Sequence, residues 1–226
     1  MVRQTFEQEM QRLQDEVLVL GGMVENAIIE SVEVLKRRDP DGARRLIAGD
    51  RVINEKRFAI EADCLVLIAT QQPLAGDLRT LAAVLEIVTE LERMGDYAKG
   101  IARINLMMGE EPLLKPLVDI PRMAEKARDM LHRALDAFVR RDVALARAIP
   151  ADDDEVDALY NQVYRELLTF IMNDPRTIDQ ATYLLWVAHN LERTADRVTN
   201  ICERVVFTVT GEMMEMDAEE GLIGIT

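Results

Sequence analysis

The chain has 226 residues, with 41 acidic and 27 basic side chains and a formal net charge of −14. A field of this sign repels phosphates, which excludes binding to nucleic acid through overall charge. Hydrophobic residues make up 49 % and aromatic residues only 4 %, a balance that favours a helical protein over an all-β or disordered one.

The first half of the sequence predicts three long helices. From Phe6 onward, apolar residues recur at alternating steps of four and three, which is the heptad spacing of a helix that packs along one side. Asp39 and Pro40 end this helix and begin the next. The helices expected in this half run from about 6 to 38, 41 to 71 and 77 to 108.

The turn from Gln72 to Arg79 joins the second and third of these helices. Pro73 stops a helix, and we expect Gly76 to take an unusual backbone angle and Asp77 to cap the helix that follows. This turn is predicted to matter to function, with a rigid structural turn as the alternative.

The second half repeats the helical pattern after a linker, residues 109–121, that holds three prolines. Its expected helices run from about 122 to 141, 143 to 172, with Pro150 as a potential break, and 178 to 210. Residues 211–226 form an acidic tail that has lost clear periodicity and is expected to be flexible.

Two motifs recur in the same order in both halves. LERMGD at 91–96 returns as LERTAD at 191–196, an offset of 100, and RRD at 37–39 returns at 140–142, an offset of 103. Two ordered matches with a consistent gap indicate an internal repeat. The sequence therefore predicts an all-α protein of two tandem, pseudo-symmetric antiparallel three-helix bundles, residues 1–108 and 122–210.

Paired acids occupy equivalent places in the third and sixth helices. Glu92 with Asp96, and Glu192 with Asp196, are four residues apart and so share one helix face. In both helices an apolar flank becomes acidic at this point. One such pair is uninformative in so acidic a chain, because a solvated helix face explains it equally well.

The second and fifth helices add polar residues at positions that are again 103 apart: Asp50 and Asn54, then Asp153 and Asp157. Counted outward from the turn near residue 175, which joins the fifth and sixth helices, Asp157 is level with Glu192, and Asp153 with Asp196. We therefore expect four clustered carboxylates in the second half and a similar cluster with one Asn in the first. A hard cation or iron would remove their repulsion, and pairing with arginine, through Arg57 for example, is the structural alternative.

Three motifs, QPLAGDLR at 72–79, TELERMGD at 89–96 and NLERTAD at 190–196, resemble the PhoU family of phosphate-transport regulators from bacteria and archaea. The resemblance covers nearly the whole chain. It implies that E(D)xxxD motifs bind metal clusters, chiefly iron, with zinc, nickel, magnesium and calcium as other options. The residues onto which this carries over are Glu92, Asp96, Glu192, Asp196, Asp153 and Asp157, whereas Asp50 with Asn54 departs from the motif at its second acid.

The resemblance further implies a non-enzymatic, negative regulator of phosphate uptake and phosphate-starvation signalling. It implies action on the ATPase subunit of the phosphate transporter and on the phosphate-sensor histidine kinase, and a homodimer. The alternative is an oxidoreductase or metal-storage protein of the di-metal carboxylate type, which needs two Glu-x-x-His pairs. Neither His132 nor His189 completes such a pair, and no nucleophile or nucleotide loop is evident.

Cys64 and Cys202 lie in apolar stretches, so we expect both to be buried thiols in a reducing compartment. No stretch approaches the ~18 apolar residues of a membrane span, and the N-terminus shows no apolar secretory segment. The expectation is a cytoplasmic protein without direct membrane insertion.

Overall fold

The computed structural model describes residues 2–216, which form helices and connecting loops without a strand. The elements are α1 (Val2–Arg37), α2 (Pro40–Gln71), α3 (Ala75–Met107), α4 (Asp119–Arg140), α5 (Val143–Ala148), the 3₁₀ turn η1 (Ile149–Asp152), α6 (Asp153–Asn173), the 3₁₀ turn η2 (Pro175–Thr177) and α7 (Ile178–Thr210). The predicted fold class is confirmed.

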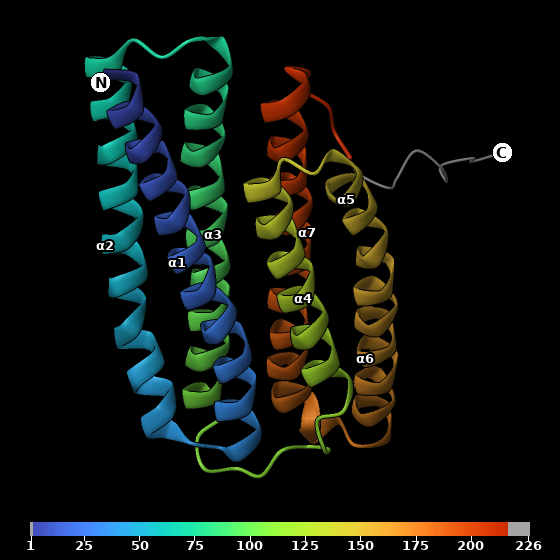
Figure 1. Cartoon of the computed structure of the whole chain (residues 1–226). Coiled ribbons are helices and arrows are strands. Elements are labelled where there is room, and N and C mark those ends of the chain that lie inside the picture. Colours follow the sequence, from blue (N-terminus) through green and yellow to red (C-terminus); the bar gives the residue numbers. More distant parts are fainter. Residues whose placement is uncertain (1, 217–226) are drawn as a thin grey trace, which may run out of the picture.

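Two antiparallel three-helix bundles stand side by side (Figure 1). The first consists of α1, α2 and α3, and the second of α4, α7 and the segment from α5 to α6. Helices α3 and α7 run in opposite directions and pack against each other between the bundles, while α1 also contacts α4. The main hydrophobic core therefore extends through both halves, beside a small separate cluster of Val34, Ala43 and Ala102.

The apolar seams predicted from the sequence are the core. In α3, Val84, Ile87 and Leu91 recur at steps of three and four and are fully buried, as are Leu184, Val187 and Leu191 in α7. In α1, Val17, Leu20 and Val24 are likewise 0 % exposed. Burial of these seams places the adjacent flank of each helix, which carries the acids, at the edge of the core.

The potential break at Pro150 is present, and the start of α4 differs from that expected. Pro150 does break the fifth predicted helix, into α5, η1 and α6, because a proline cannot donate the backbone hydrogen bond of a helix interior. Helix α4 begins at Asp119 rather than near Arg122, since Pro121 is tolerated in a first turn. Of the predicted tail, residues 211–216 follow α7 without helix, and the rest lies outside the described residues.

The expected chemistry of the turn after α2 was wrong in two respects. The left-handed residue is Gln72, with φ of 46°, and not Gly76. Helix α3 already begins at Ala75, behind Leu74, whose side chain makes no capping hydrogen bond. Asp77 therefore lies inside the first turn, where a carboxylate favours the helix dipole, instead of capping the helix.

Within residues 2–216, none of the helices combines the length and the apolar character needed to span a bilayer. Cys64 and Cys202 are both fully buried, as predicted, and desolvation raises the pKa of each thiol to about 12. Neither cysteine is paired with another.

Alanine substitutions at two neighbouring glycines of α1 should change the stability of the protein in opposite directions. A Cβ on Gly21 would lie 2.2 Å from Leu135 Cδ1 of α4, whereas one on Gly22 would meet nothing within 4 Å. We expect Gly22→Ala to stabilise the protein by about 0.5–1 kcal/mol through helix propensity, and Gly21→Ala to destabilise it by about 1 kcal/mol through overpacking. Urea unfolding of the two variants measures both effects, and equal shifts would contradict the close approach of α1 and α4.

Candidate metal centre

The second acid cluster consists of Asp153 and Asp157 of α6 with Glu192 and Asp196 of α7. Val156 and Leu191 are fully buried and fix the rotation of the two helices, so the acids beside them lie on facing flanks. The repulsive fields of Asp157, Glu192 and Asp196 act directly on Asp153, which shows that residues from both helices share one site.

Burial and mutual repulsion make this cluster costly to ionise. Loss of hydration, followed by repulsion from neighbouring acids, raises the pKa of Asp153 to about 7. The same two causes raise the pKa of Glu192 to about 7. Buried oxygens of both side chains, Asp153 Oδ1 and Glu192 Oε2, accept no hydrogen bond, although His189 Nδ1 lies 3.2 Å from the latter.

These features fit a hard cation, because all four side chains offer oxygen donors and two of those oxygens are buried without a donor. In the part of the chain that the structure describes, however, no three His, Cys, Asp or Glu side chains already stand in a metal-holding arrangement. A bound cation would therefore require the carboxylates to turn towards one another.

The first acid cluster, Asp50 and Asn54 of α2 with Glu92 and Asp96 of α3, has internal partners instead. The ammonium of Lys99 lies 2.6 Å from Asp50 Oδ2 and 3.1 Å from Asp96 Oδ1. The Asn54 amide donates to Asp50 Oδ2 at 3.1 Å. Arg57 Nη1 lies 3.5 Å from Glu92 Oε2, so the pairing with arginine that the sequence left open is present here.

Lys99 is not among the residues that the sequence led us to expect at this site. The signal that could have found it is its position three residues after Asp96, which brings a lysine onto the acidic flank of the same helix. The hydrogen bond to Asp50 raises the pKa of Lys99, and burial counteracts this only in part. The ammonium is therefore charged in the neutral pH range and offsets the charge of the acids around it.

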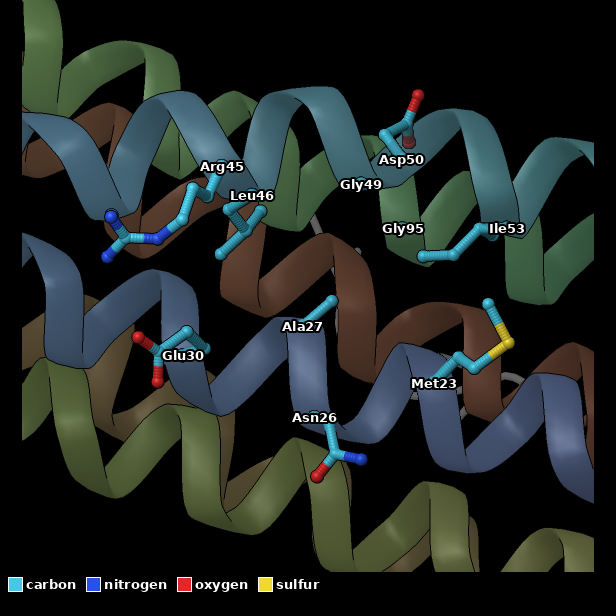
Figure 2. A pocket seen from close by; sticks show the side chains of 11 residues that line it. Met23, Asn26, Ala27, Glu30, Arg45, Leu46, Gly49, Asp50, Ile53 and Gly95 are labelled. Atoms are coloured by element: carbon cyan, nitrogen blue, oxygen red, sulfur yellow. The ribbon is translucent and has the colours of Figure 1, made fainter.

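A pocket of about 430 Å³ opens between α1 and α2 beside this cluster, with Gly95 of α3 behind it (Figure 2). Arg45 and Glu30 lie at one end, while Ile53 lies towards the other. Asp50 lines the pocket, is only 6 % exposed and keeps one carboxylate oxygen, Oδ1, without a hydrogen bond. The pocket thus borders the first acid cluster and is mainly apolar elsewhere.

The sequence matches the family described as PhoU domain twice, over residues 17–104 and 120–205. It is 40 % identical over 209 residues to the phosphate-specific transport system accessory protein PhoU homolog of Caulobacter vibrioides, which covers 92 % of this chain and 91 % of the relative. It is 36 % identical over 207 residues to the phosphate-specific transport system accessory protein PhoU of Escherichia coli, covering 92 % and 86 % of the two chains.

Two crystal structures show the same fold. The phosphate transport system regulatory protein PhoU from Streptococcus pneumoniae aligns with a TM-score of 0.86 at 32 % identity, over 93 % of this chain and 99 % of that one. PhoU from Pseudomonas aeruginosa aligns with a TM-score of 0.86 at 33 % identity, over 92 % and 100 % of the two chains. The similarity to these proteins, in sequence and in fold, therefore extends along nearly the whole chain.

Proposed function

The chain belongs to the PhoU family, and we propose on this basis that it is a non-enzymatic regulator of phosphate uptake and phosphate-starvation signalling. The observation that carries the proposal is the near full-length match to accessory and regulatory proteins of phosphate transport. A regulator must act through binding, and the two bundles offer long helical faces for this purpose.

The regulation proposed is negative and takes place in the cytoplasm. The partners are the ATPase subunit of the phosphate transporter and the phosphate-sensor histidine kinase. The net charge of −14 supports partners with basic surfaces, because complementary charge speeds and orients association.

A homodimer is part of the same proposal. Three large apolar side chains of α2, Phe58, Leu65 and Val66, are each more than half exposed, at 59 %, 59 % and 58 %. Exposed apolar surface of this kind is typical of contacts with another protein. Sedimentation of the purified chain measures the dimer directly.

We further propose that the second acid cluster holds a metal ion, chiefly iron, with zinc, nickel, magnesium or calcium as other options. Its ligands would be Asp153, Asp157, Glu192 and Asp196. When bound, the metal would neutralise the carboxylates and supply no chemistry of its own. Carboxylates from both helices bound to one metal would then hold α6 and α7 at a fixed distance. The surface formed by these two helices would keep the shape that a partner binds.

Glu192→Gln combined with Asp196→Asn tests the role of the metal. We expect the bound metal to be lost and the affinity for the ATPase subunit or the kinase to fall about tenfold or more, with an unchanged helical circular dichroism spectrum. The apolar seams account for the unchanged fold. A matched control, Asp41→Asn with Glu55→Gln, removes the same charge from exposed positions of α2.

Loss of metal with unchanged partner affinity would show that the metal is incidental. The regulatory proposal itself is tested by deletion of the gene. Cells without the protein should express phosphate-starvation genes in phosphate-rich medium and regain repression when the gene is restored. Unaltered expression and unaltered phosphate uptake would overturn the proposal.

A further inference from the structure

The two halves place different residues at equivalent positions around their acids. Along α3 and α7 the offset is 100, so Thr199 stands where the first half has Lys99. Along α2 and α6 it is 103, so Tyr160 stands in place of Arg57, and Asp157 in place of Asn54. Each change removes a positive charge or adds a carboxylate, and all three favour a more negative second cluster.

The cations of the first cluster are held close to the acids. Lys99 contacts carboxylates of both helices, and its side chain is only 19 % exposed. Arg57 is 21 % exposed and lies between Glu61, at 2.8 Å, and Glu92, at 3.5 Å. Partly buried pairs of this kind are screened much less by salt than exposed ones.

The basic side chains Arg193 and His189 beside the second cluster are more exposed, at 40 % and 56 %, than Lys99 and Arg57. Arg193 lies 3.6 Å from Asp196. Thr199 is only 5 % exposed and carries no charge, so it cannot replace an ammonium. Two carboxylate oxygens of this cluster, Asp153 Oδ1 and Glu192 Oε2, are buried without a hydrogen bond, against one in the first cluster, Asp50 Oδ1. An external cation would compensate the two.

We propose that Lys99 and Arg57 are built-in counter-ions that close the first acid cluster to metal, so that metal binds to the second cluster alone. This inference rests on the metal binding proposed above. An ammonium held by two carboxylates repels a divalent ion at this range and so weakens the binding of metal by the same two carboxylates. Entry of metal would also break a largely buried ion pair, and Asn54 would supply one carboxylate fewer.

The test exchanges the distinguishing residues. Lys99→Thr with Asn54→Asp gives the first cluster two of the three distinguishing side chains of the second and leaves Arg57 in place, whereas Glu192→Gln with Asp196→Asn disables the second cluster. Wild type, each double variant and the quadruple variant are dialysed anaerobically against Fe²⁺ and separately against Mn²⁺. The amount of metal bound per chain is then measured by inductively coupled plasma mass spectrometry. Lys36→Thr, which removes an exposed lysine, is the control.

We expect the wild type to lose its metal when the second cluster is disabled. The Lys99→Thr, Asn54→Asp variant should bind about twice as much metal as the wild type, and the quadruple variant should keep the added share. Circular dichroism and thermal unfolding verify the fold, and Lys99→Gln, which keeps a polar side chain without the charge, serves if the first variant is unfolded.

Retention of half or more of the metal after the second cluster is disabled would overturn the inference, since the first cluster would then bind metal beside Lys99. So would a folded Lys99 variant that binds no more metal than the wild type. If the wild type binds none but the Lys99 variants do, Lys99 does close the first cluster to metal, but metal binding by the second cluster, and with it the proposed metal role, is wrong. If no variant binds metal, both are wrong.

Discussion

Metal-free protein should lose stability as the pH rises from about 4 to 7, and Asp153→Asn with Glu192→Gln should abolish most of this loss. Folding raises the pKa of both carboxyls to about 7, above the usual 3.8 and 4.5. The folded state therefore binds more protons than the unfolded state across this range. The resulting gain in folding stability is fully present below the pKa values of the unfolded state. It is lost as the pH rises through the pKa values of the folded state.

The expected change in the free energy of unfolding is large for two substitutions that hardly alter side-chain shape. At pH 8 the double variant should be more stable than metal-free wild type by on the order of 1–2 kcal/mol, after allowance for solvent screening and for coupling between the two carboxyls. For a chain of this length the change corresponds to a rise of roughly 2–8 °C in Tm. Thermal unfolding in chelator between pH 4 and 8 measures it, and parallel pH profiles for both proteins would contradict it.

The equivalent change in the first half should have the opposite sign. Asp50→Asn removes the closest partner of Lys99 and leaves a partly buried ammonium with Asp96 alone. We expect this variant to be destabilised by about 2 kcal/mol at pH 8, whereas Asp153→Asn stabilises. The same substitution at equivalent positions of the repeat would thus change stability in opposite directions, because only Asp50 has a close counter-ion.

Arg197→Met should be the most damaging single change between the two bundles. Arg197 Nη1 of α7 lies 3.3 Å from Glu90 Oε2 of α3, and the two side chains are 18 % and 11 % exposed. Asn200 donates to the same oxygen at 3.2 Å. Removal of the guanidinium leaves a buried carboxylate with less compensation, so we expect a loss of about 3 kcal/mol.

A matched control is available in Arg93, which also pairs with Glu90, at 2.6 Å, but is 48 % exposed. Arg93→Met should cost less than about 1 kcal/mol, as exposed ion pairs usually do. Replacing both partners, Glu90→Leu with Arg197→Met, should recover most of the stability because no charge is then left buried. Urea unfolding measures the cycle, and equal losses for the two arginine variants would contradict the importance of burial.

Helix order and the repeat could be predicted from the sequence because both depend on local spacing. The seams through Leu91 and Leu191 recur every three or four residues, and only a helix brings such positions onto one side. The same spacing places Glu92 and Glu192 beside those seams. Offsets of 100 and 103 residues then identify equivalent positions in the two halves without any coordinates.

The sequence by itself thus determined the all-helical class, the doubled bundle and the flank on which each acid lies. The tertiary structure decided which acids have counter-ions on the neighbouring helix. Lys99 and Asp50 are 49 residues apart, and their 2.6 Å contact depends on the distance and rotation between α2 and α3. Helix period is a property of consecutive residues, whereas an ion pair between helices depends on packing and side-chain rotamers, which no local pattern encodes.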